Sequence, residues 1–169
     1  DQTESDLDMK LVYDVAHNIA KVEKHKVDGK ERNLVVHRKG ATRAFPSNRA
    51  EIPSKYRDLG QPVLVPGSMG TSSWILLGKS NSMDLSFGST AHGAGRTMSR
   101  SKARRNFTEE NVKKSLNDKG IFIKALTRDG VVEETPEAYK DVDSVVNVSH
   151  NLGIATKVAK LVPIGVIKG

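Results

Sequence analysis

The sequence predicts an α+β fold in which helices pack against a mixed sheet. Short runs of aliphatic and β-branched residues, bounded by Gly or Pro, are typical of strands. Other segments carry apolar residues three and four positions apart, which is the period of a helix. The two kinds of segment do not alternate regularly, as they would in a doubly wound sheet. With 169 residues, we expect residues 1–169 to form a single domain or a large part of one.

A helix is expected over residues 10–24, after an acidic loop at residues 1–8. Its apolar residues are spaced four, four and three positions apart, so they share one helical face. Tyr13, His17 and Lys21 then lie on the opposite side. The residues of the apolar face are Leu11, Val15, Ile19 and Val22.

Three short strands and one long loop are expected next. Asp28–Gly29 is a turn dipeptide, and the apolar residues 34–36 after it indicate a strand. Residues 46–62 contain three prolines and are expected to form an ordered loop. Further strands are expected at 62–66, which ends on a proline, and at 74–77.

The second half is expected to contain three helices and two strands. Residues 96–105 form a basic helix, and Thr108 caps the next helix, which ends before Gly120. Strands are expected at 121–126 and 157–167. The third helix is closed by Gly153, and its packed face comprises Val142, Val145, Val146 and Ser149.

The composition excludes several classes of protein. There is no cysteine, which excludes disulfides, thiolate zinc sites and a cysteine nucleophile. The apolar runs are far shorter than the roughly 20 residues of a membrane-spanning helix. The 27 Lys and Arg residues exceed the 20 Asp and Glu residues, and the net charge of +7 favours a polyanion as partner. A generically basic surface is the alternative. Because the chain starts at Asp1, we expect it to be a piece of a longer protein.

Residues 88–96 are the strongest candidate for a site. The small residues after His92 would let a phosphate approach backbone N–H groups at the start of a helix. Arg96 and Arg100, one helical turn apart, could clamp phosphate oxygens from one face. A neutral imidazole at this place could attack a phosphorus atom. The alternative is a tight turn whose histidine only packs, since the loop matches neither a Walker A nor a dinucleotide pattern.

Three weaker features have equally plain alternatives. The loop 66–73 offers hydroxyls and backbone amides to a nucleotide, or simply connects two strands. His17 could be a metal ligand and Asn18 a phosphate contact, although a metal site needs three or four ligands. The basic segment 37–43 could place Lys39 and Arg43 on an RNA phosphate backbone, or be a solvated loop.

Six segments together resemble the RtcB family of tRNA-splicing RNA ligases, in its archaeal type. They occur in the family's order over nearly the whole chain. The most specific are His-Gly-Ala-Gly-Arg at 92–96 and the closing Ile-Lys-Gly. The matching segments are 14–18, 37–43, 66–73, 88–100, 136–142 and 165–169.

The resemblance implies the C-terminal part of an RtcB-type fold and a ligase that depends on GTP and Mn²⁺. In such an enzyme a histidine attacks the α-phosphate of GTP, releases pyrophosphate and carries GMP as a phosphoramidate. GMP activates an RNA 3′-phosphate, which is first released from any 2′,3′-cyclic phosphate, and a 5′-hydroxyl end then displaces GMP. The implied partners are tRNA halves, the N-terminal portion missing from this chain and the protein archease. The implied location is cytoplasmic, without a membrane.

The resemblance also assigns residues by position. His92 would be the guanylylated nucleophile and His17 a manganese ligand. Lys39, Arg96 and Arg100 would bind phosphates of the RNA ends. The residues implied to contact GMP are His17, Asn18, Pro66, Gly67, Ser68, Met69, Ser73, His92, Gly93, Ala94, Gly95 and Lys168.

Two alternatives remain at this point. The family's other metal ligands, an Asp, a Cys and further histidines, lie in the missing N-terminal portion, so the chain could be a non-catalytic basic fragment that binds RNA. A histidine phosphotransfer domain is less favoured, because its histidine belongs on a helix and not in a glycine-rich segment.

Overall fold

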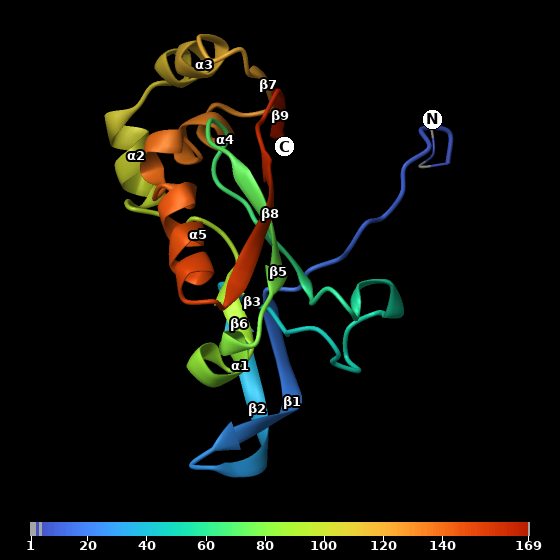
Figure 1. The fold of residues 1–169 in the computed structure, drawn as a ribbon. Coiled ribbons are helices and arrows are strands. Elements are labelled where there is room, and N and C mark those ends of the chain that lie inside the picture. The colour runs from blue at the N-terminus through green and yellow to red at the C-terminus, as the bar shows by residue number, and fades with distance from the viewer. Residues whose placement is uncertain (1–2, 4, 169) are drawn as a thin grey trace.

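The computed structural model describes residue 3 and residues 5–168, and it confirms the α+β class (Figure 1). Short 3₁₀ turns at Ser54–Tyr56 and Pro136–Ala138 interrupt the loops. The strands are β1 (Asn18–Val27), β2 (Lys30–Lys39), β3 (Ala41–Arg43), β4 (Pro62–Val65), β5 (Ser73–Gly78), β6 (Ser89–Ala91), β7 (Phe122–Ala125), β8 (Ala155–Leu161) and β9 (Gly165–Lys168). The helices are α1 (Asn81–Ser86), α2 (Arg100–Asn106), α3 (Glu109–Asn117), α4 (Arg128–Glu133) and α5 (Val142–Asn151).

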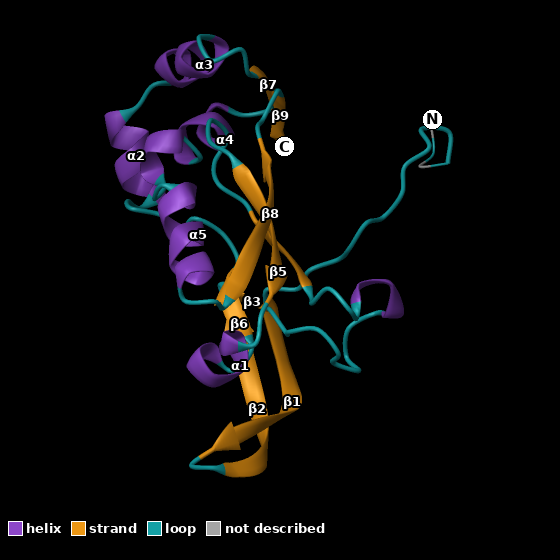
Figure 2. Ribbon diagram, in the orientation of Figure 1, coloured by secondary structure: helices purple, strands orange, loops and turns teal. Residues whose placement is uncertain are grey.

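The described strands form four small sheets rather than one continuous sheet (Figure 2). The largest has the order β4-β5-β8 and is antiparallel throughout. The antiparallel hairpin β1–β2 extends from the body, and β3 pairs antiparallel with β6 beside its base. The parallel pair β7–β9 lies at the other end, near the C-terminus.

Two apolar clusters hold these elements together. In the first, α5 packs on the β4-β5-β8 sheet, and Val142 and Val146 meet Val63, Val65 and Leu76. The second cluster joins α3 and α4 to the β7–β9 pair, with inward residues of those strands at its edge. It comprises Met69, Val112, Leu116, Ile121 and Val131, with Phe107, Ile123, Ala125 and Val166 packed against it.

Most of the predicted elements are confirmed. The predicted strands 34–36 and 74–77 lie within β2 and β5, and the predicted strands 62–66 and 121–126 contain β4 and β7. The Thr108 hydroxyl caps α3 by accepting from Asn111 N, and α5 spans the predicted face. The last predicted strand is divided into β8 and β9, because Pro163 cannot donate to a ladder.

The prediction of a first helix at residues 10–24 is wrong. Residues 9–17 form neither helix nor strand, and the rest belongs to β1. The supposed apolar face is scattered, with Leu11 84% and Val22 71% exposed. The strand was hidden because its inward face carries Glu23 and His25, so no alternation of apolar and polar residues marks it. His17 therefore precedes a strand and does not lie on a helix. Of the acidic segment predicted as loop, residues 1, 2 and 4 lie outside the described residues, and residues 5–8 form a turn.

The basic helix begins later than predicted. Ser99 caps α2 through its hydroxyl, which accepts from Lys102 N, and the helix starts at Arg100. Arg96 lies outside it, in an isolated bridge to Tyr139. The glycine segment after His92 is therefore not at a helix N-terminus, and Arg96 and Arg100 do not share a helical face.

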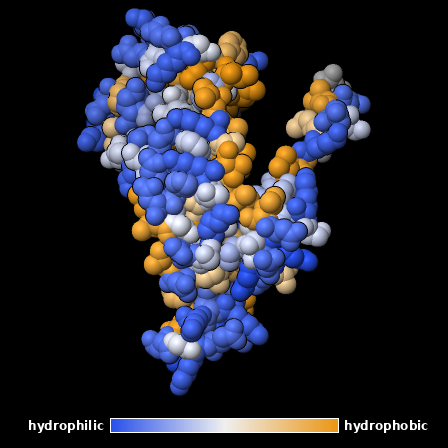
Figure 3. Space-filling view, viewed as in Figure 1, coloured by the Kyte–Doolittle hydropathy of each residue, from blue (hydrophilic) through white to orange (hydrophobic). Residues whose placement is uncertain are grey.

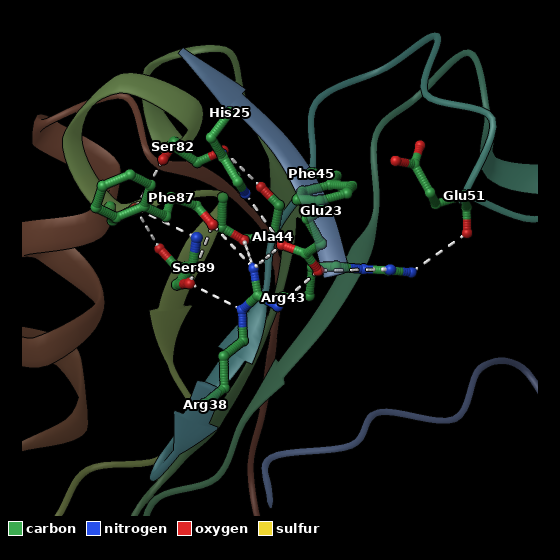
Figure 4. Close-up of polar contacts among 12 residues, drawn as sticks. Glu23, His25, Arg38, Arg43, Ala44, Phe45, Glu51, Ser82, Phe87 and Ser89 are labelled. Atoms are coloured by element: carbon green, nitrogen blue, oxygen red, sulfur yellow. Dashed lines mark hydrogen bonds and ion pairs between the residues drawn. The ribbon is translucent and has the colours of Figure 1, made fainter. Parts of the chain in front are cut away.

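A charged cluster is buried where the hairpin meets the body (Figure 4). The guanidinium of Arg38 on β2 donates to both carboxylate oxygens of Glu23 on β1, each at 2.8 Å. His25 Nε2 lies 3.1 Å from the same carboxylate, and Arg43 NH1 lies 3.9 Å from it. Glu23, His25 and Arg38 are 5%, 3% and 2% exposed. Burial by itself raises the pKa of Glu23, but Arg38, His25 and Arg43 outweigh it and hold that pKa below its ordinary range.

Apolar residues also gather on the surface. Figure 3 shows them near the C-terminal end, where Leu126, Ile164 and Ile167 are more than four-fifths exposed. Patches of this kind mark faces that associate with other protein. No helix in the described part of the chain is long and apolar enough to cross a membrane.

Replacing Glu23 with Gln should lower the free energy of unfolding by about 3–5 kcal/mol, because it leaves buried arginines without their carboxylate. Since the folded pKa of Glu23 is lowered, its stabilisation is present above the pKa of the unfolded chain and is lost as pH falls. The free energy of unfolding of the variant should therefore fall less steeply with decreasing pH than that of the wild type. Urea denaturation at several pH values measures both effects.

Glu31→Gln, at an exposed position of β2, is the matched control and should change stability by less than about 0.5 kcal/mol. Equal stability of the Glu23 and Glu31 variants would contradict the importance of the buried cluster.

Candidate functional site

Two histidines that are 75 positions apart in the sequence lie side by side. His17 immediately precedes β1, and His92 immediately follows β6. Their ring centroids are 4.4 Å apart, with the planes tilted by 33°. The His17 carbonyl accepts from Gly40 N at 3.2 Å. Gly40 has a φ of +67°, a backbone conformation that favours glycine, and a Cβ there would be in ordinary contact with the His92 ring at 3.7 Å.

Two cavities flank this histidine pair. One, of about 540 Å³, is lined by His17, Asn18, Lys39, Gly40 and His92. The register of the hairpin pairs Asn18 with Lys39, which brings both to the end of the hairpin beside His92. The other, of about 290 Å³, is lined by Val15, His17, Leu64, Pro66 and His92.

A third cavity gathers Lys168 and those residues of the loop 66–73 that the resemblance implies to contact GMP. It measures about 280 Å³, and Pro66 belongs both to it and to a cavity of the histidine pair. The Pro66 carbonyl also accepts from Ala94 N at 2.9 Å, which joins the segment after His92 to this loop. The residues that line this third cavity are Pro66, Gly67, Ser68, Met69, Ser73, Glu134, Tyr139, Val166, Ile167 and Lys168.

The loop 66–73 is shaped by its own hydroxyl groups. Thr71 Oγ1 accepts from Ser68 N at 2.7 Å, and Ser73 Oγ accepts from Gly67 N at 3.4 Å. Met69 is 6% exposed and also packs in the second apolar cluster. The loop therefore presents a fixed surface, with these two amides engaged within it and not free as the sequence suggested.

Glu134 and Tyr139 line this cavity, although neither was among the site residues predicted from the sequence. The Tyr139 hydroxyl donates to Glu134, and Arg96 lies 4.9 Å from the Tyr139 ring centroid. Burial and then Glu134 raise the pKa of Tyr139. Burial alone raises the pKa of Glu134, but Tyr139, Lys168 and Arg96, together with Arg100, hold it below its ordinary range. An ionised carboxylate therefore lies at the wall of the cavity.

The two predicted phosphate arginines converge on Glu134 although they share no helix. Arg96 NH1 and Arg100 NH2 each lie 3.4 Å from Glu134 Oε1. The remaining Arg96 donors bond to the Met98 and Glu133 carbonyls and to the Tyr139 hydroxyl. The Arg100 side chain is 63% exposed, so it remains accessible to a ligand.

The described residues do not make a metal site by themselves. No group of three or more His, Asp or Glu side chains within residues 3 and 5–168 is arranged to hold a metal ion. His17 is exposed at the cavity edge and could supply one imidazole, where a manganese site needs several ligands.

Comparisons of the sequence with known proteins identify its family. A family model described as tRNA-splicing ligase RtcB matches residues 1–169. The chain belongs to the RtcB family of tRNA-splicing ligases. It is 54% identical over 161 residues to a tRNA-splicing ligase RtcB from Nanoarchaeum equitans. The aligned region covers 95% of this chain and 34% of that protein. Similar relatives with the same description come from Archaeoglobus fulgidus (57% identity, 99% of this chain, 35% of that protein) and Aeropyrum pernix (58%, 96% and 34%).

The chain thus spans about a third of the length of these RtcB relatives. Its resemblance to the family, stated above on six segments, is confirmed. The closing Gly169 of the last segment lies outside the described residues, whereas Lys168 is described and lines the third cavity.

Tyr139 and Glu134, the two cavity residues that were not predicted, differ in how far the sequence marks them as part of the site. Tyr139 lies within one of the six segments that carry the RtcB resemblance, so its position in that segment is a signal in the sequence. Glu134 gave no signal, because only the fold brings the end of α4 to β9. The resemblance assigns His17, Asn18 and His92 to GMP and Lys39 to RNA phosphate, and the structure brings all four to one cavity.

His92 is held in its neutral form. Burial, followed by the adjacent His17, lowers the pKa of His92 below the ordinary value of 6.5, while a backbone hydrogen bond acts in the opposite direction. Because protonation is disfavoured in the folded chain, the imidazole stays neutral at neutral pH, which is the form that can act as a nucleophile.

Replacing His17 with Gln should raise the pKa of His92 toward its ordinary value, since a titratable imidazole next to it is removed. Titration of the histidine ring resonances by NMR measures this. His150→Gln, on the exposed side of α5, is the matched control and should leave the pKa of His92 unchanged. An unchanged or lower His92 pKa in His17→Gln would show that the neighbouring ring does not contribute to the lowered pKa of His92.

Proposed function

We propose that this chain is the nucleotide-binding part of a GTP-dependent RNA ligase, in which His92 carries GMP. One observation supports this most strongly: His92 and the loop 66–73 line neighbouring cavities that share Pro66. A nucleoside in the third cavity would place its phosphates toward His92. Membership of the RtcB family supports the same assignment, since its relatives are described as tRNA-splicing ligases.

The proposed first step is an attack on GTP. A neutral ring nitrogen of His92 forms a bond to the α-phosphorus, and the bond from that phosphorus to the bridging oxygen of pyrophosphate breaks. The electron pair leaves with pyrophosphate, and the product is a histidine–GMP phosphoramidate. Burial beside His17 keeps the ring unprotonated for this step.

The proposed second stage joins RNA ends. An oxygen of an RNA 3′-phosphate attacks the phosphorus of the bound GMP and releases His92, and a 5′-hydroxyl then displaces GMP from the activated end. A 2′,3′-cyclic phosphate is first hydrolysed to the 3′-phosphate. The tRNA halves would be the natural substrates, and archease a partner of the whole protein.

Particular residues are proposed to hold the reacting groups. In the third cavity, Ser68, Ser73 and Lys168 would bind the nucleoside, together with the other residues of its wall. Asn18 and Lys39 lie at the histidine pair and would contact phosphate. The same proposal assigns Gly93, Ala94 and Gly95 to the GMP phosphate and ribose.

Two arginines are proposed to attract the RNA end in different ways. Arg100 is exposed and would bind RNA phosphate directly, by exchanging its contacts with Glu133 and Glu134. Arg96 would add charge beside the site while it holds Tyr139 and Glu134 in place.

Manganese is proposed to bind at His17, with its other ligands supplied by the part of the protein that lies outside this chain. A divalent cation would neutralise the triphosphate. Because the described residues provide no complete site, we assign no step to the ion.

A non-catalytic RNA-binding role is the second candidate. The net charge of +7 and the exposed basic residues Lys39 and Arg100 favour binding of a polyanion whether or not GMP is transferred. Binding of RNA without any covalent adduct would support this role.

Incubation with GTP and Mn²⁺ should give a covalent GMP adduct on His92, in the chain combined with the rest of the protein. His92→Ala should abolish the adduct because no nucleophile remains, and intact-mass measurement detects it. His150→Ala is the matched control and should retain it. An undiminished adduct in a folded His92→Ala variant would remove His92 from the mechanism.

The chain alone should bind Mn²⁺ weakly and form the adduct slowly or not at all, because one imidazole cannot hold the ion at useful affinity. Isothermal titration calorimetry should show no stoichiometric binding. Adding the remaining portion of the protein should restore metal binding and adduct formation together. Tight binding of one Mn²⁺ by the isolated chain would show that the ligands lie within it.

A further inference from the structure

The strand that carries His92 is too short to fix that histidine by itself. β6 has three residues and, among the strands that the structure describes, pairs only with the three residues of β3. Two-stranded pairs of this size have little stability of their own. His92 follows the last residue of β6, so other contacts must determine where its ring lies.

Arg38 supplies such contacts at the start of β6. Its Nε donates to Ser89 Oγ and its NH2 to the Phe87 carbonyl, both at 2.8 Å (Figure 4). Phe87 and Gly88 have φ values of +50° and +65°, and left-handed backbone at a phenylalanine is strained unless its surroundings hold it. The guanidinium therefore holds the strained turn from which β6 begins.

Arg38 is itself held on the hairpin. Its two terminal nitrogens bond the Glu23 carboxylate, and the residue is 2% exposed. It directly precedes Lys39, whose register partner Asn18 follows His17. One rigid group thus links the hairpin that carries His17 to the strand that carries His92.

We propose that Arg38, through Ser89 and the turn at Phe87, is a positioning residue that sets the contact between His92 and His17. Neither Arg38 nor Ser89 lines the cavities of the histidine pair, so Arg38 acts through β6 and not by touching a substrate. The expected effect of Arg38 on guanylylation rests on the proposed function. Its expected effect on the contact between the two histidine rings is independent of that function.

The test compares variants that lack or keep the Ser89 hydroxyl group while the Glu23–Arg38 pair stays in place. Ser89→Ala removes the acceptor of Arg38 Nε but keeps the Glu23–Arg38 pair, whereas Ser89→Thr keeps a hydroxyl. Ser54→Ala, at an exposed position, is the matched control. The first readout is the nuclear Overhauser effect between the ring protons of His17 and His92, assigned with His17→Gln and His92→Gln variants.

The ring cross-peak should weaken in Ser89→Ala and keep its wild-type intensity in Ser89→Thr and Ser54→Ala. A wild-type cross-peak in Ser89→Ala overturns the proposal, and so does equal loss in both Ser89 variants. If Ser89→Ala does not fold, Arg38→Lys replaces it, because lysine keeps the charge opposite Glu23 without the Nε donor. A folded Arg38→Lys variant with an unchanged cross-peak also overturns the proposal.

The second readout is the rate of adduct formation with GTP and Mn²⁺, in the chain combined with the rest of the protein. A displacement of about 1 Å at the nucleophile costs on the order of 10²-fold in rate, so Ser89→Ala should slow the adduct by about tenfold to a hundredfold and Ser89→Thr should restore it. A wild-type protein that forms no adduct would contradict the proposed function, while the ring cross-peak would still decide the positioning role.

Discussion

The carboxylate of Glu23 is the constraint on which the arrangement of this chain depends. Removing a charge from water is costly, and Glu23 is tolerated at 5% exposure only because Arg38 binds both of its oxygens. Arg38 joins β1 to β2 and to the turn before β6, and Arg43 of β3 faces the same carboxylate. Three consecutive strands, β1 to β3, and the distant strand β6 therefore meet around one carboxylate. Apolar packing of this region would hold the strands together but would not fix their register so narrowly.

The candidate site lies at the start of β1 and at the ends of β2 and β6. His17 and His92 extend from neighbouring strand ends, and the loop between β4 and β5 reaches them through the hydrogen bond from Ala94 to Pro66. The second apolar cluster brings β9, and with it Lys168, to the far side of that loop. The site is thus assembled from loops on a rigid scaffold, a common arrangement in proteins that bind nucleotides.

The sequence predicted the elements whose signals are local. Thr108 and Gly120 mark the ends of α3, and the proline-bounded run 62–66 marks β4. The first strand of the hairpin was predicted as a helix because its buried face is polar. A buried ion pair does not produce the alternation of apolar and polar residues by which a strand is recognised. The resemblance to the RtcB family selected the candidate site residues from motifs. Glu134 escaped because its place beside Lys168 depends on packing between α4 and β9, which no local pattern encodes.

The most direct measurement is a map of amide chemical shifts in the ¹⁵N-labelled chain during titration with GTP. The central claim is that one nucleotide lies between the loop 66–73 and His92. It predicts that the shifts concentrate at residues 67–73 and 93–95, with smaller changes at Tyr139 and Lys168. Shifts confined to the outer end of the β1–β2 hairpin or to α5, with the loop 66–73 and the segment after His92 unaffected at saturation, would contradict it.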